Sequence, residues 1–365
     1  MPVARMSNAR DARDRATGPM IRRRTTLIVA GFAAAWFLPI RAEAPTVRVA
    51  MAEADKTRVK HPRPERGFHM PPIALPSIPK AISYKSMGPW KIRSSSNGWK
   101  QLRLENNWLF VRGGGASGLR LTDIEARSHG IIMRGSNLPK LRVERVRVVQ
   151  GRTSSAGGGI VTVWNGADGA VFRDLTYVGD PKRPAPNGSS PWAGIALAGK
   201  DANDTGSFSI ERFDFSNLVT EPGDRYPNAD GISTERGYSG TIANGRVTNA
   251  SDACLDIKGD VSVDNVYLSG CREGIKAWSD QKHGLIAMGT NRVAAILGAG
   301  TPSRSRSMYI ETLILDGNPA KPLLRAEKGI FNLTIGTLVA ARDQKLMDEN
   351  SFKGSSVKIL RRVTR

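Results

Sequence analysis

From residue 101 onward, two kinds of short apolar run alternate along the chain. One kind is rich in small residues, as in Gly274–Trp278, and the other is β-branched with polar residues at alternate positions, as in Val261–Leu268. Side chains alternate between the two faces of a strand, so each run can bury one face. The two kinds follow one another eight times, and no long window has the period of an amphipathic helix. This steady repetition predicts an all-β protein, a right-handed parallel β-helix (solenoid) of about eight to ten coils over residues 101–345.

The segments on either side have a different composition. Residues 45–100 are rich in Pro, with Lys and Arg scattered between, which is typical of an extended linker or an N-terminal cap. Residues 346–365 are predicted to be a final strand or a basic C-terminal tail.

Residues 1–44 have the pattern of an export signal peptide. Arg22–Arg24 precede the apolar run Leu27–Ile40, and Ala42–Ala44 fits a small-x-small cleavage site. The arginines resemble a twin-arginine signal, and Met1 or Met20 is the start. The run is too short for a stable membrane anchor. We therefore expect a periplasmic or secreted protein.

The formal net charge of +21 narrows the choice of partner. Such a charge attracts polyanions, unless it only reflects a generally basic proteome. No nucleic-acid recognition motif is visible and aromatic residues make up only 6% of the chain, so nucleic acid is not expected. An acidic polysaccharide is the expected partner, bound by a monomer.

The charged side chains of residues 228–278 align when the apolar runs are stacked. Ile232, Leu255 and Ile275 are 23 and 20 residues apart, about one coil each. This register predicts two outward columns on an exposed sheet face, with Asp230 and Asp252 at the corner beside them. The columns are Ser233, Asp256 and Lys276, and then Glu235, Lys258 and Trp278.

The two cysteines, Cys254 and Cys271, both lie in this stretch. In an oxidising compartment they could join neighbouring coils by a disulfide. The register does not place them in one column, so two buried thiols are an equal alternative.

The predicted cluster combines three carboxylates with a lysine. Asp230, Asp252 and Asp256 suit a hard cation such as Ca²⁺. Lys276 could act as a base only if its pKa is lowered, and the metal and Lys258 would both lower it. The matching reaction is removal of the proton next to a uronate carboxylate. The structural alternative is that the Asp residues form turns and that Lys276 makes an ordinary cross-strand pair.

At these residues the chain resembles a known family. Asn-Ala-Asp-Gly at 228–231, Ser-Asp-Ala-Cys-Leu-Asp at 251–256 and Gly-Ile-Lys at 274–276 are similar to motifs of the pectate lyases of polysaccharide lyase family nine, within the pectin-lyase-like superfamily. The resemblance implies a calcium-dependent lyase that cleaves an acidic polysaccharide by β-elimination. It places calcium ligands at Asp230, Asp252 and Asp256 and the base at Lys276, with one expected ligand replaced by Ala253.

Two other functions stay open. Part of the same motifs resembles polygalacturonase-type glycoside hydrolases, in which Asp230 and Asp252 would be the base and acid of an inverting pair. A β-helix that binds polysaccharide without cleaving it would also fit the missing ligand. In each case side chains near the cluster are expected to hold the substrate. They are Arg225, Arg236, Arg272, Lys258 and Trp278.

Overall fold

The computed structural model describes the backbone of four early strands and most of residues 117–365. The early strands are β1 (Ile82–Tyr84), β2 (Trp90–Ile92), β3 (Gly98–Glu105) and β4 (Leu109–Val111). Within 117–365 it leaves out 153–154, 187–191, 200–205, 224–227 and 302. The predicted signal peptide, most of the predicted linker and Arg225 therefore lie outside the described residues.

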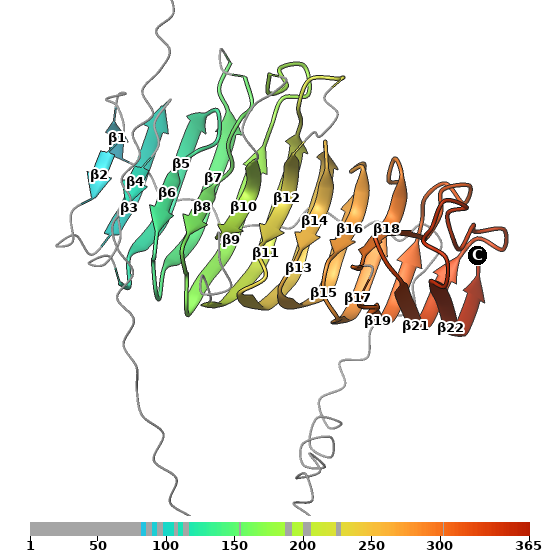
Figure 1. Ribbon diagram of the computed structural model, residues 1–365. Coiled ribbons are helices and arrows are strands. Elements are labelled where there is room, and N and C mark those ends of the chain that lie inside the picture. The colour runs from blue at the N-terminus through green and yellow to red at the C-terminus, as the bar shows by residue number, and fades with distance from the viewer. Residues whose placement is uncertain are drawn as a thin grey trace, which may run out of the picture. The chain divides into compact units, whose positions relative to one another are not determined.

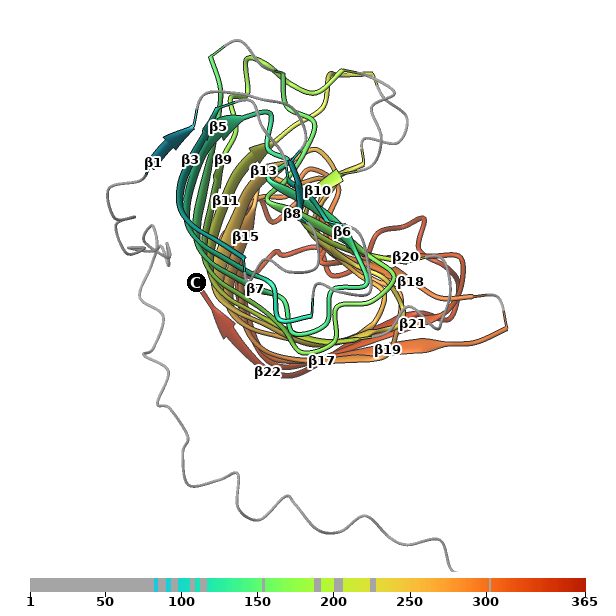
Figure 2. The ribbon, with the colours of Figure 1, turned by 90° about the vertical axis from the view of Figure 1, so that its left-hand side faces the viewer.

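The strands form two long parallel sheets, and the chain passes from one sheet to the other at almost every strand. Figure 1 shows successive strands side by side, and Figure 2 shows the two sheets as facing walls. The first sheet holds β1, β3, β5 (Arg120–Ser128), β7 (Arg142–Gln150), β9 (Ala170–Val178), β11 (Gly206–Leu218), β13 (Tyr238–Ala250), β15 (Asp260–Ser269), β17 (Gln281–Met288), β19 (Arg306–Leu315), β21 (Phe331–Ala340) and β22 (Ser356–Thr364). The second holds β2, β4, β6 (Met133–Ser136), β8 (Val161–Trp164), β10 (Trp192–Ala198), β12 (Ala229–Thr234), β14 (Ala253–Ile257), β16 (Glu273–Ala277), β18 (Ala294–Ala299) and β20 (Leu324–Glu327). The predicted parallel β-helix is confirmed.

One strand within residues 101–345, β17, was not predicted from the pattern of apolar runs. Its inward positions include Gln281 and His283, which are buried although they are polar, and Gly284 lies beside them. These residues interrupt the apolar alternation on which the prediction relied. Parallel pairing also extends to both sides of residues 101–345, from β1 to β22.

Inward side chains stack in columns from coil to coil. One column runs along the second sheet through Ile232, Leu255, Ile275, Ile296 and Leu324, all fully buried. Each coil alone could bury little of this surface, so the stack is what provides a core. The alignment of the apolar residues therefore fixes the register of the polar residues beside them.

The strands of the first sheet bend at a column of residues in the left-handed region. The column has φ values of 50° to 58° and runs through Asp123, Arg145, Asp174, Arg212, Asn244 and Asn265. Asp and Asn adopt this conformation more readily than most residues. Their side chains also pair along the column: Arg212 Nε and Nη2 lie 2.6 and 2.7 Å from the Asp174 oxygens. We call this column the bend ladder.

Candidate functional site

The first predicted column lies on β12, β14 and β16, which are neighbours in the second sheet, and the second column lies directly after these strands. Ser233 pairs with Asp256, and Asp256 pairs with Lys276, as the sequence register predicted. The next positions follow in step, because Lys258 N donates to Thr234 O at 3.0 Å and Trp278 N donates to Ile257 O at 3.1 Å. The structure thus brings Asp230, Asp252, Asp256, Lys258, Lys276 and Trp278 together.

The prediction that these groups lie on an exposed face is wrong for the carboxylates. Asp230, Asp252 and Asp256 are only 7%, 5% and 9% exposed. Long side chains from the following coil cover them: Lys276 Nζ donates to Asp252, and Trp278 Nε1 donates to Asp256 Oδ1 at 2.7 Å. The cluster is therefore a partly closed site in which charges interact strongly.

The outer column forms a second layer over the cluster. Lys258 Nζ donates to Glu235 Oε1 at 2.5 Å and lies 3.7 Å from Asp256 Oδ2. Trp278 has the ammonium of Lys328 over its ring, 5.3 Å from the centroid. This layer presents cations and an aromatic face beside the carboxylates.

Asp230 is hydrogen-bonded by a backbone amide, whereas side chains donate to the other two aspartates. Its Oδ1 accepts a hydrogen bond from Ala253 N at 2.9 Å. Burial raises the pKa of Asp230 well above its usual range, and Asp256 and Asp252 raise it further. Burial also raises the pKa of Asp256, against the opposing effects of Lys258 and Lys276. The carboxylates are thus crowded in a region with too little positive charge.

Lys276 is held as an ammonium ion. Burial alone would lower its pKa, but the carboxylates of Asp252 and Asp230 outweigh burial and the pKa of Lys276 is raised. This is the outcome expected for a lysine among carboxylates without a metal. In this state Lys276 is a cation that stabilises Asp252, and it is not a base.

Glu273 belongs to the cluster and was missed by the sequence prediction. It is 2% exposed, and its Oε2 accepts no hydrogen bond in the described part of the chain. Lys276 Nζ lies 3.9 Å from that oxygen. Burial raises the pKa of Glu273. The sequence could have indicated Glu273, because the register that aligns Asp256 with Lys276 also aligns Ala253 with Glu273.

The remaining predicted contacts differ in outcome. Arg272 Nε lies 3.3 Å from Glu273 Oε1, so Arg272 joins the cluster. Arg236 is exposed, and Arg225 lies outside the described residues.

Cys254 and Cys271 form a disulfide with a Cα–Cα distance of 5.5 Å, and are not two free buried thiols. The bond ties β14 to the turn before β16.

Two glycines in the quoted motifs have a packing role. A Cβ on Gly231 would lie 2.3 Å from Cys254 O, and one on Gly274 would lie 2.6 Å from Ala295 O. Neighbouring coils approach closely here, so no larger residue fits without displacement of backbone. Part of the motif resemblance is therefore explained by how the coils stack next to the site.

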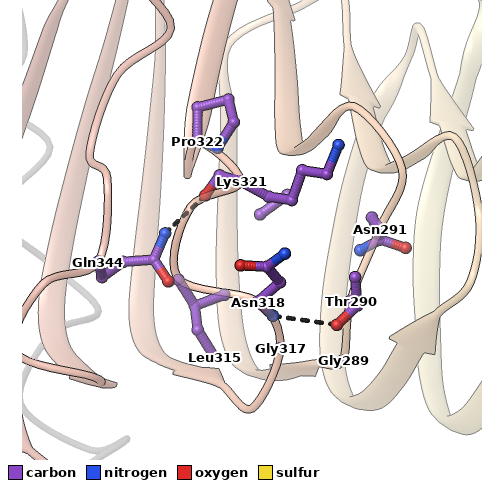
Figure 3. Close-up of a pocket in the computed structure, with 10 residues that line it drawn as sticks. Gly289, Thr290, Asn291, Leu315, Gly317, Asn318, Lys321, Pro322 and Gln344 are labelled. Carbon is purple, nitrogen blue, oxygen red and sulfur yellow. Dashed lines mark hydrogen bonds between the residues drawn. The ribbon is translucent and has the colours of Figure 1, made fainter.

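A pocket of about 260 Å³, part of it open to solvent, lies beyond the cluster at the corners that follow β17 and β19. Its polar groups hold the turns together: Asn318 N donates to Thr290 Oγ1 at 3.0 Å, and Gln344 Nε2 donates to Lys321 O at 2.7 Å (Figure 3). None of the carboxylates of the cluster lines this pocket. We therefore place the candidate chemistry at the cluster.

Comparison of the chain with protein-family models, curated proteins and solved structures finds no match. Within the described residues, no three or more His, Cys, Asp or Glu side chains are arranged to hold a metal ion. The same part of the chain contains no helix long and apolar enough to cross a membrane.

Proposed function

We propose that this β-helix protein binds an acidic polysaccharide and cleaves it by β-elimination, with Lys276 as the base and calcium held by Asp230, Asp252 and Asp256. The observation that supports the proposal is the crowding of buried carboxylates around one lysine. Burial of several acids whose pKa values are raised is costly for stability, and such groups are enriched at functional sites. The net charge of +21 favours an acidic substrate.

The candidate ligands are of the type that calcium prefers, because they are carboxylate oxygens and the cluster has more acidic than basic groups. The present arrangement does not hold an ion, since Lys276 occupies Asp252. Release of Lys276 from Asp252 is therefore part of the proposal. A bound calcium ion would supply the positive charge that lowers the pKa of Lys276 and neutralises a uronate carboxylate.

In the proposed reaction, deprotonated Lys276 removes the proton on the carbon next to the uronate carboxylate. The electron pair forms a carbon–carbon double bond, the bond to the glycosidic oxygen breaks, and that oxygen takes up a proton. No water is consumed. Arg272 and Lys258 can attract the substrate carboxylates, and the Trp278 ring offers a flat surface for a sugar.

The test is a screen of polygalacturonate, alginate and glycosaminoglycans for unsaturated products by ultraviolet absorbance, with calcium and with a chelator. Lys276→Gln should lower the rate by about a hundredfold or more, the usual worth of a general base. Lys276→Arg should fail equally, because guanidinium stays protonated. Lys282→Ala is the control, since Lys282 lies over the ring of Tyr309 on the other sheet. Full activity of Lys276→Gln would refute this role.

A hydrolase remains the second candidate, because the environments of Asp230 and Asp252 differ. The pKa of Asp230 is raised by burial, whereas Asp252 is paired with Lys276. Unequal carboxylates suit an acid and a base, with Asp230 as the acid and Asp252 as the base, which reverses the roles that the motif resemblance assigns. A hydrolase would release reducing ends without unsaturated product and without need of calcium, and a binding protein would release neither.

A further inference from the structure

We propose that the pocket at the corners after β17 and β19 binds the carboxylate group of a uronate unit in an acidic polysaccharide. The inference takes its class of ligand from the proposed function, but it concerns binding alone and involves neither the cluster nor a metal. It is carried by three side chains that line this pocket and bear nitrogen donors. They are Asn291, Asn318 and Lys321.

The buried amide of Asn291 is the main observation. Asn291 is 3% exposed, and its Nδ2 has no hydrogen-bond partner in the described part of the chain. The orientation of the amide is fixed, because Oδ1 accepts a hydrogen bond from Cys271 N at 3.1 Å. Figure 3 shows Nδ2 on the side towards the other residues of the pocket. A buried donor without an acceptor costs stability, so an acceptor is expected in the pocket.

Two further donors reach the same pocket from the turn before β20. Asn318 Oδ1 accepts a hydrogen bond from Ala320 N at 3.0 Å, so Nδ2 is the end of this amide that can bind a ligand. Figure 3 shows this nitrogen and the ammonium of Lys321 on the side towards Asn291. Lys321 is the one charged residue among the described residues that line the pocket. Two amide donors and a cation, with no acid between them, favour an anionic oxygen acceptor.

The walls of the pocket suit the carboxylate of a sugar. A carboxylate is planar and has two oxygens, so it can accept hydrogen bonds from donors on two sides. Ala295, Leu315 and Pro322 add apolar wall that the carbon atoms of a sugar ring can contact. Part of the 260 Å³ is open to solvent, so a carboxylate can enter while its sugar stays joined to a chain outside.

The pocket lies on the same corner of the coil as the cluster. Cys271, whose N–H donates to Asn291, directly precedes Arg272, and Arg272 contacts Glu273. Asn291 lies in the turn before β18 and Lys321 in the turn before β20, one and two coils beyond β16. With stacked strands about 4.8 Å apart, the pocket lies about 5–10 Å further along the coil axis. One oligosaccharide can therefore contact both the cluster and the pocket.

The test measures binding of a galacturonate hexamer and a mannuronate hexamer to the full chain by isothermal titration calorimetry, in chelator to prevent cleavage that needs calcium. Asn291→Asp keeps the acceptor for Cys271 N and replaces the free donor by an oxygen, so it should weaken binding about tenfold or more. Lys321→Gln should weaken binding about tenfold. Lys345→Gln is the matched control, because Lys345 is an exposed lysine nearby that does not line the pocket.

The methyl ester of the hexamer that binds keeps the sugar rings but has no carboxylates. It should bind more weakly than the acid, and with equal affinity to the wild type and both pocket variants. A measurement of Tm shows whether Asn291→Asp is folded, and the exposed position of Lys321 makes Lys321→Gln a second test that does not depend on it.

Equal affinity of the wild type and Lys321→Gln for the hexamers would overturn the inference, and so would a wild type that binds neither hexamer. Both results leave the proposed lyase to the separate screen for unsaturated products. Weaker binding by the pocket variants, in a protein that forms no unsaturated product, would support the pocket and refute the lyase.

Discussion

Protonation of His283 should destabilise the folded protein, because this side chain belongs to a buried polar chain behind the site. Val263 N donates to His283 Nδ1 at 3.1 Å, and His283 Nε2 lies 3.0 Å from Gln281 Oε1. Gln281 Nε2 in turn donates to Ile257 O, at the end of β14. With Nδ1 accepting, the ring is neutral and Nε2 carries the proton. A second proton on Nδ1 would face a donor, so the hydrogen bond from Val263 would be lost.

The size of the effect follows from the pKa. Burial lowers the pKa of His283 from 6.5 to about 4. The unfolded chain therefore takes up this proton first as the pH falls. The stability from neutral His283 is fully present above pH 6.5 and is lost as the pH falls to about 4. A pKa difference of about 2.5 corresponds to about 3 kcal/mol.

The assay is urea unfolding at several pH values between 7 and 4 for the wild type and His283→Gln. The variant is expected to be less stable at pH 7, and its loss of stability on acidification should be smaller by about 3 kcal/mol. Buried acids such as Asp230 change stability with pH in the opposite direction, but both proteins contain them. The difference between the two proteins therefore isolates the contribution of His283. Parallel curves for the two proteins would refute the reasoning.

Three further predictions concern the disulfide, the bend ladder and the site. Replacement of Cys254 and Cys271 by Ala should lower the free energy of unfolding by about 3 kcal/mol, the value for a closed loop of this length, as urea unfolding against the fully oxidised protein will show. Asn265→Ala should cost about 1–2 kcal/mol, because φ is 50° there and the bond to Asn244 is lost, whereas equal stability would contradict a role for the ladder. In chelator at pH 7, Asp230→Asn should raise Tm and Asp174→Asn should lower it, and shifts of the same sign would contradict the difference between unpaired acids in the cluster and paired acids in the bend ladder.

The sequence predicted the fold because the apolar columns are nearly continuous. Ile232, Leu255 and Ile275 are spaced by one coil each, and aligning them was enough to place Asp256 beside Lys276. The same reliance on apolar residues hid β17, where the inward positions of Gln281 and His283 are polar and hydrogen-bonded. A buried polar network has no hydrophobic signature.

The site was predicted less completely than the fold. Alignment gives the column of a residue and not the reach of its side chain, so the cover that Lys276 and Trp278 form over the aspartates was not foreseen. Glu273 was missed because it matches no part of the motif. The pairing of Cys254 with Cys271 stayed open because the two residues lie at different positions of successive coils.

In the bend ladder, buried acids are paired with arginines from neighbouring coils. Each buried acid there has its own arginine: Arg145 Nε is 2.5 Å from Asp123, and Arg212 binds both oxygens of Asp174. In the cluster, Asp230 has one backbone donor and repels its neighbours, although the same kind of pairing could have been built on adjacent coils. Replacing the carboxyl group by an amide should therefore destabilise the ladder, where it breaks a matched ion pair, and stabilise the cluster, where it removes a buried acid without a cation of its own. A stability gain at Asp230 would mean that the protein keeps an unfavourable buried carboxyl group, which is expected if that group serves a ligand.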